Sequence, residues 1–173
     1  MDQLTGFKPK PQVEMWKGLE TVIYLARRVQ LLPDTMYSFI YQVDMNHLVR
    51  YGRFVYGETY LALPSGTVPS LVYNLLNVPW CPHVYALYPT NFLWGVQRSL
   101  RLDLLQKRVS STRREDESLF SDSDISCLDE IIDEWKNSKL IRGRQDEAWR
   151  KTPRYTVVDI DVIHSSLNRT SYS

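Results

Sequence analysis

The sequence predicts a predominantly α-helical α+β fold, in which helices pack with a small antiparallel sheet of two or three short strands. Apolar residues recur at helical spacing in several segments, alternate with polar residues in shorter ones, and are separated by glycine or proline. With 173 residues and 43% hydrophobic residues, the chain can form one domain with a core and leaves little room for two. We therefore expect a single domain over residues 1–173, with its core at about 12–160 and a flexible polar tail at 161–173.

Two helices are predicted before residue 52. The first covers residues 13–29, and Lys17 falls on its solvated side. Its apolar face is formed by Trp16, Leu19, Ile23 and Ala26. The connection at residues 31–34 is short and contains a proline suited to a first helical turn, so we expect the two helices to pack as an antiparallel pair.

The stretch from residue 36 to residue 76 carries the clearest pattern, and we expect the rest of the chain to pack around it. It begins as a helix with one buried stripe and a polar opposite face. The stripe consists of Met36, Phe39, Ile40, Val43 and His47. Gly52 ends this helix, and a period close to two over residues 54–63 predicts a strand. A turn at residues 64–66 and a helix over 70–76 complete the stretch.

The second half of the chain predicts strands at residues 83–87 and 100–109, joined by residues 89–99. Residues 55–63 are a candidate third strand of the same sheet. The charged segment 110–118 reads as a mobile loop.

A further helix is predicted after Ser121, because Ser121 and Asp124 have the spacing of a capping box. Its apolar stripe consists of Ile125, Leu128, Ile131, Ile132 and Trp135.

Composition narrows the function classes. A formal net charge of +1 argues against a protein whose main task is to coat nucleic acid or an anionic membrane. Cys81 and Cys127 are far apart and lack CxxC spacing, which favours reduced thiols over a zinc site or a disulfide. The N-terminus has no signal-peptide core and no window resembles a membrane span, so we expect a cytoplasmic protein.

Two pairs of residues could suggest catalysis, but for each pair a structural role is better supported than a catalytic one. Asp44 and His47 share a helix face and could act as an acid–base pair, although Asp44 could equally orient His47 or hold Arg50 or Arg53. No second histidine stands at the spacing of a metalloprotease. Cys81 and His83 lie too close on an extended segment for a catalytic dyad. We predict no catalytic residue, no cofactor and no metal site.

Basic and aromatic residues offer two kinds of binding surface. The basic set comprises Arg98, Arg101, Lys107, Arg108, Arg113 and Arg114, with Phe92 and Trp94 nearby. Its spacing matches no nucleic-acid-reading element, and alternating charges on the outer face of a strand explain part of it, so binding of nucleic acid is the weaker hypothesis. The 11 tyrosines and 5 tryptophans favour a protein interface, where such side chains dominate the binding energy.

The central stretch also resembles a known family, the Panacea domain of SocA-type antitoxins. The resemblance rests on Asp44, His47, Leu48, Arg50, Tyr51, Gly52, Arg53, Gly57, Thr59, Tyr60, Ala62, Leu63, Pro64, Gly66, Val68, Pro69, Ser70, Tyr73, Leu75 and Leu76. Three positions depart from the family pattern: Phe54 and Thr67 replace prolines, and Glu58 replaces an aspartate. None of these changes removes a charge or a glycine. The similarity extends over roughly residues 15–160, including the capped helix and Ala148–Trp149.

The resemblance implies an antitoxin that neutralises a cognate protein toxin by direct contact, with the toxin encoded by a neighbouring gene. The candidate contact residues are polar or aromatic members of the motif: Asp44, His47, Arg50, Tyr51, Arg53, Glu58 and Tyr60. An equally weighted alternative is that these residues form a scaffold network, and that residues 88–99 or 110–118 select the toxin.

Three other functions remain open at this stage. Some SocA-type proteins resemble proteolytic adaptors, and the serine-rich tail would then dock a protease, so that deletion of residues 165–173 would abolish toxin turnover but not binding. A phage-encoded counter-defence protein is a second alternative. An enzyme using Asp44 and His47 is the third.

Overall fold

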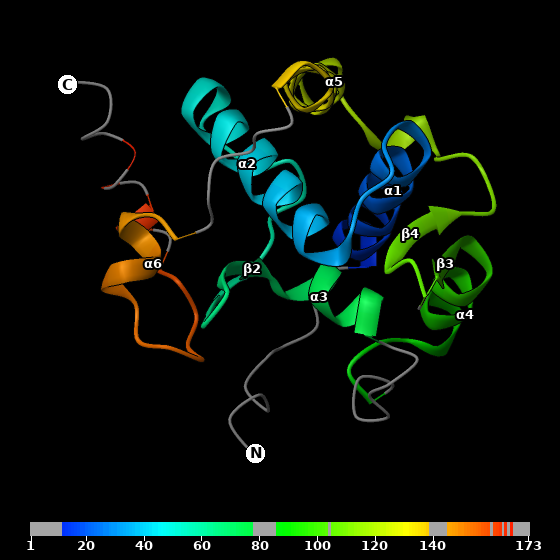
Figure 1. Ribbon diagram of the computed structural model, residues 1–173, viewed down its shortest axis with the longest axis horizontal. Helices are drawn as coiled ribbons and strands as arrows, with labels where there is room; N and C mark the ends of the chain where they lie inside the picture. The colour runs from blue at the N-terminus through cyan, green and yellow to red at the C-terminus, as the bar shows by residue number, and fades with distance from the viewer. Residues whose placement is uncertain are drawn as a thin grey trace.

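The computed structural model describes residues 12–77, 86–103, 105–138, 145–159, 161–163, 165 and 167 (Figure 1). It confirms a mainly helical α+β fold with two small antiparallel sheets. The elements in chain order are α1 (Gln12–Arg28), α2 (Pro33–Tyr51), β1 (Tyr60–Leu63), β2 (Gly66–Pro69), α3 (Ser70–Asn77), α4 (Thr90–Ser99), β3 (Leu100–Asp103), β4 (Arg108–Ser111), the short helix η3 (Glu117–Leu119), α5 (Asp122–Ser138) and α6 (Glu147–Lys151).

Helix α2 runs through the middle of the molecule, as Figure 1 shows. Pro33 occupies its first turn, where a missing N–H costs nothing. Gly52 ends it in the left-handed conformation, with φ 70° and its N–H bonded to the carbonyl of Leu48. The predicted stripe is buried, but the predicted polar face is buried too, including Tyr41 and Met45. That expectation was wrong because two separate cores enclose the helix.

The main core lies between α2 and helices α1, α3, α4 and α5. Its fully buried side chains include Leu19 of α1, Phe39 of α2, Phe92 of α4 and Leu128 of α5. Helix α1 packs chiefly on β4 and α3, whereas α2 packs chiefly on α5 and β2. The predicted antiparallel pair of α1 and α2 is therefore not the main packing of either helix, although both contribute side chains to the same core.

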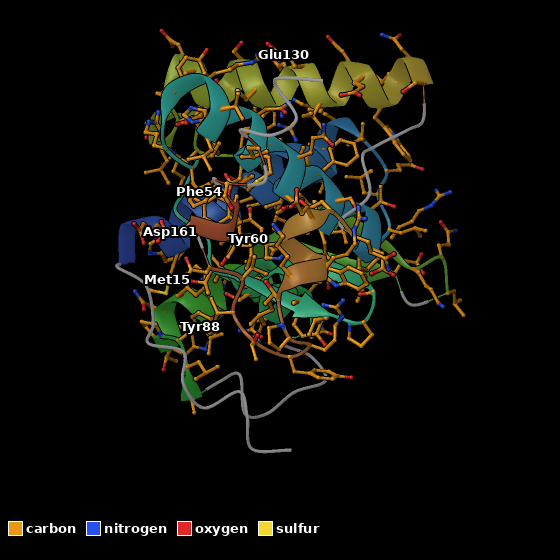
Figure 2. The ribbon with its side chains drawn as sticks, turned by 90° about the vertical axis from the view of Figure 1, so that its left-hand side faces the viewer. Met15, Phe54, Tyr60, Tyr88, Glu130 and Asp161 are labelled. Carbon is orange, nitrogen blue, oxygen red and sulfur yellow. The ribbon has the colours of Figure 1, made fainter. Side chains whose placement is uncertain are left out.

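The second core lies on the other side of α2 and is completed by the C-terminal part of the chain. It joins Tyr41, Met45, Leu48, Tyr60 and Ala62 to later residues, namely Ala148, Val158 and Ile163. Figure 2 shows Phe54 and Tyr60 beneath α2 with Asp161 nearby, and Phe54 packs against this core. Val162 and Leu167 also pack against this core, while the flexibility of the tail stays a prediction.

In the first sheet the predicted strand is shorter than expected, but it pairs with chain segments on both of its edges. Only residues 60–63 of the predicted strand are β-structure, and they pair with the unpredicted strand β2 in the register Tyr60↔Pro69 to Leu63↔Gly66. Residues 155–158 line the other edge of β1, where the N–H of Ala62 bonds to the carbonyl of Thr156 at 2.9 Å. Strand β2 escaped prediction because its four residues are too few and too rich in turn formers to show a period.

The second sheet is a hairpin, not one long strand. β3 and β4 pair from Leu100↔Ser111 to Asp103↔Arg108, so residues 100–109 contain a turn. The segment before them, predicted as a connection, is helix α4, and residues 55–63 do not join this sheet. Alternation in 100–104 was visible, but pairing depends on contacts that the sequence does not display. Most of the predicted strand 83–87, with Cys81 and His83, lies outside the described residues.

The charged segment at 110–118 is anchored, contrary to the expectation of a mobile loop. Glu20 of α1 accepts hydrogen bonds from Arg113 at 2.5 and 2.8 Å and from the N–H of Asp116 at 2.8 Å. Glu115 accepts from Arg27 at 2.8 Å and Arg28 at 2.5 Å. The charges that suggested solvent exposure are instead paired across to α1.

In the described part of the chain, no helix has the length and apolar character needed to cross a membrane.

Candidate partner-binding site

The predicted site residues lie around the C-terminal end of α2 and the loop that follows it. Asp44 is buried and receives two bonds, from the N–H of Val55 at 2.9 Å and from the hydroxyl of Tyr60 at 2.6 Å. It holds the loop after α2 against β1. Burial and the Asp44 carboxylate raise the pKa of Tyr60 well above its usual value, so the phenol stays protonated and donates. Asp44 was expected to orient His47 or to hold Arg50 or Arg53, and this was wrong because the loop folds back over it.

His47 is fully buried and points to helix α5 instead of Asp44. Its Nδ1 lies 2.8 Å from the carbonyl of Arg53, which can only accept, so Nδ1 carries a proton. Its Nε2 lies 3.1 Å from the hydroxyl of Ser123 and 3.2 Å from Asp124. The imidazole therefore joins the end of α2 to the start of α5, and no substrate can reach it in this arrangement.

Asp124 is the hub of the surrounding charges. Its buried carboxylate contacts Lys17 of α1 at 2.6 Å, His47 at 3.2 Å and Arg53 at 3.1 Å. It also accepts the N–H of Ser121 at 2.9 Å, which confirms the predicted capping box. Burial alone would raise the pKa of Asp124, but the bonds from Lys17 and Ser121 outweigh burial and lower it. Lys17 is thus only 15% exposed at its side chain and not solvated as expected.

Glu58 holds the start of α3. Its carboxylate accepts the N–H of Leu71 at 3.2 Å, the hydroxyl of Ser70 at 3.0 Å and the N–H of Thr59 at 2.7 Å. The hydroxyl of Tyr56 donates to it at 3.0 Å. Glu58 therefore satisfies the N–H of Leu71, one of the groups that a helix start leaves unpaired, and its negative charge faces the positive end of the helix dipole.

Three of the seven predicted residues reach the surface. One guanidinium nitrogen of Arg50 donates to both carboxylate oxygens of Glu130 in α5, at 2.7 and 2.6 Å, and Figure 2 shows Glu130 on the outer side of that helix. Arg53 bonds to Asp124 and to the hydroxyls of Ser121 and Ser123, and its side chain is 46% exposed. Tyr51 is 49% exposed, and its ring packs on His47 with 4.7 Å between centroids.

Comparison with known proteins assigns the family. A family model described as antitoxin SocA-like, Panacea domain, matches residues 39–149. The chain belongs to this family. Membership confirms the resemblance and supports an antitoxin role in general. No curated protein and no solved structure matches the chain.

Within this Panacea-domain protein, the seven predicted residues divide into two groups. Asp44, His47, Glu58 and Tyr60 are interior side chains that fix the backbone. Arg50, Tyr51 and Arg53 form an exposed group, here called the α2 end surface, at the junction of α2 and α5. Sequence patterns could not separate the groups, because both kinds of residue are polar or aromatic and lie within one short motif.

Sequence reasoning assigned no site role to Asp124 and none to Lys17. The capping box did predict a hydrogen-bonded role for Asp124. The cations that pair with it are Lys17, 107 positions earlier in the sequence, and Arg53 in the loop after α2, and the capping pattern reveals neither. Among the described residues, no group of three or more His, Cys, Asp or Glu side chains is arranged to hold a metal ion.

Proposed function

We propose that this antitoxin neutralises a cognate protein toxin by direct binding and that the α2 end surface contacts the toxin. Family membership supports a toxin partner in general. The observation that carries the proposal is that Tyr51 presents half of its side chain to solvent, between two arginines, on a base of buried hydrogen bonds. Tyrosine and arginine supply much of the binding energy at protein interfaces, above all when they are held rigidly.

We also propose that the toxin is encoded by a neighbouring gene and that both proteins act in the cytoplasm. The enzymatic alternative has no support from the geometry, since Asp44 and His47 are enclosed and bond to different partners.

Growth rescue with copurification tests the proposal. Each neighbouring open reading frame is expressed from an inducible promoter, with and without this protein carrying an N-terminal tag. We expect one neighbour to be toxic, to be rescued by coexpression, and to copurify. Rescue with falling toxin levels and no stable complex would point instead to a proteolytic adaptor, and absence of any rescued toxin would refute the cognate pairing.

Tyr51→Ala then locates the contact. We expect it to weaken binding of the toxin at least tenfold, because it removes an interface anchor, while the thermal midpoint changes little. Tyr155→Ala is the matched control, since Tyr155 is also a tyrosine and is 57% exposed. Equal affinity of the Tyr51 and Tyr155 variants would remove the α2 end surface from the toxin interface.

A further inference from the structure

Four cations on α4 and the β3–β4 hairpin lack carboxylate partners. Among the residues that the structure describes, Arg98, Arg101, Lys107 and Arg108 are exposed and form no ion pair. The described cations of α1 and α2 behave differently, because each has a carboxylate partner: Lys17, Arg27, Arg28 and Arg50. Positive charge is thus neutralised around α1 and α2 but is left available on this side of the molecule.

These cations lie on consecutive elements, helix α4 and the hairpin that follows it. Arg98 follows Trp94 by four residues on α4, so both side chains lie on the same exposed stripe. Arg101 donates to the carbonyls of Gln97 at 2.5 Å and Leu100 at 2.9 Å, which places it over the end of that helix. Arg108 lies on the same exposed face of the hairpin as Arg101, because β3 and β4 alternate exposed and covered positions. We name Trp94, Arg98, Arg101, Lys107 and Arg108 the α4–hairpin face.

The carboxylate of Asp103 shapes this surface. It accepts the N–H groups of Leu105 and Gln106, each at 2.9 Å, and so fixes the turn of the hairpin. Arg108 donates instead to the amide oxygen of Gln30 at 2.6 Å. Arg101 and Arg108 are therefore held in place by neutral oxygen atoms, and neither forms an ion pair with the carboxylate of Asp103.

Trp94 adds a large apolar side chain to the charges. It is 59% exposed, although tryptophan is the side chain that gains most from leaving water. A half-exposed tryptophan beside arginines has the composition of a binding hot spot. Binding would bury the indole and pair the cations in one step.

We propose that the α4–hairpin face binds an acidic protein surface containing an apolar pocket for Trp94, and that it selects the toxin. This proposal rests on the proposed neutralisation by direct binding. A protein fits better than nucleic acid for two reasons. The chain as a whole carries only +1, and the spacing of the basic residues matches no nucleic-acid-reading element.

The face lies away from the α2 end surface. Figure 1 shows α4 and β3–β4 on one side of the molecule and the C-terminal end of α2 toward the other. Substitutions at separate surfaces act independently, so the two proposals can be tested apart.

The first test measures affinity for the toxin that coexpression identifies. R98E/K107E reverses two cations without removing a side-chain hydrogen bond given by the structure, and W94A removes the indole. K136E/R150E is the matched control, because it reverses two exposed cations on α5 and α6 with the same change in net charge. We expect R98E/K107E and W94A each to weaken binding at least tenfold and the control to bind like the wild type. Unchanged affinity of both variants would overturn the proposal and leave direct neutralisation intact.

The second test needs no toxin. A displayed random peptide library is selected on the wild-type protein, with soluble R98E/K107E as competitor to remove peptides that bind elsewhere. We expect enriched peptides to combine aspartate or glutamate with a large apolar residue and to bind W94A at least tenfold more weakly than the K136E/R150E control. Peptides without acidic residues, no enrichment, or binding of a single-stranded oligonucleotide that R98E/K107E abolishes would each overturn the proposal. Because rescue is not involved, failure here is distinct from failure of the antitoxin assay.

Discussion

Asp124 is the residue on which most of the local structure depends. It is a fully buried carboxylate that joins α1, the end of α2 and the start of α5 through Lys17, His47 and Arg53. Burial of a charge is unfavourable unless opposite charges and hydrogen bonds compensate for it, and here both are present. Removing the charge would leave the Lys17 ammonium and the Arg53 guanidinium without their shared acceptor.

We therefore predict that Asp124→Asn lowers the free energy of unfolding by about 3 kcal/mol at pH 7. Urea denaturation followed by tryptophan fluorescence measures the change. Asp133→Asn is the control on the same helix, because Asp133 is exposed, and a change below about 0.5 kcal/mol is expected for it. Equal effects of the two substitutions would show that the hub contributes no special stability.

The same carboxylate gives the stability a defined dependence on pH. The pKa of Asp124 is lower in the folded protein than the value of about 3.9 for an unfolded aspartate. The stabilisation is thus present above about pH 4 and is lost as pH falls through the folded pKa. We predict that the stability difference between wild type and Asp124→Asn shrinks steadily between about pH 5 and pH 2. A difference that stays constant over this range would contradict the assignment.

At the scale of elements, helix α3 depends on the carboxylate of Glu58, which lies twelve residues before Ser70 in the sequence. Glu58 reaches the N–H of Leu71 and the hydroxyl of Ser70, which stabilises the start of this eight-residue helix. Short helices gain little from their own hydrogen bonds and rely on caps and packing.

We predict that Glu58→Asp destabilises this protein by about 1–2 kcal/mol, because one methylene less withdraws the carboxylate from its donors by about 1.5 Å. Thermal unfolding followed by circular dichroism measures the loss. Glu134→Asp on the exposed side of α5 is the control and should leave the midpoint unchanged. A neutral Glu58→Asp would mean that the backbone of α3 shifts to follow the shorter side chain.

The element predictions failed where pairing or packing decided the outcome. Helix α4 contains Gly95, a residue that lowers helix propensity, and it lies in the segment that was expected to be a connection. In the structure the position of Gly95 faces Trp16, where a built Cβ would lie 2.7 Å from the indole. The glycine permits close packing of α4 on α1, a contact that local propensity does not reveal.

At the scale of the whole molecule, the second core makes the C-terminal segment part of the fold. Residues 155–158 pair with β1, and Ile163 is buried beside Tyr60. The family match ends at residue 149, so this closure is made by chain beyond the matched region. Without it, the apolar side of α2 that carries Met45 and Leu48 would face solvent.

We predict that ending the chain after Thr152 removes at least about 4 kcal/mol of stability, since burial of Val158 and Ile163 alone contributes roughly 2 kcal/mol each. Urea denaturation and limited proteolysis measure the effect. A chain ending after Leu167 is the control, because it keeps every described residue, and it should match the full-length protein. Equal stability of the two truncated chains would show that the second core is dispensable.

The shorter truncation also separates two functions. If the chain ending after Leu167 binds its toxin but no longer lowers toxin levels in cells, the polar tail acts in proteolysis. If rescue and toxin levels match those of the full-length protein, neutralisation needs binding alone.

The sequence by itself determined the features that depend on neighbours along the chain. Helical spacing, Pro33, Gly52 and the capping box at Ser121 defined α1, α2 and α5, and the motif between Asp44 and Leu76 identified the family. These signals are local because capping, proline geometry and amphipathic spacing act within a few residues.

Only the tertiary structure decided which side chains are available to a partner. Asp44, His47 and Glu58 are polar residues of the same motif as Tyr51 and Arg53, yet they are buried and bonded to distant segments. The cations near Trp94 likewise could be recognised as unpaired only from the tertiary structure, which shows which carboxylates pair with the other cations. Burial and charge pairing arise from contacts between residues far apart in the chain, so no local pattern contains them.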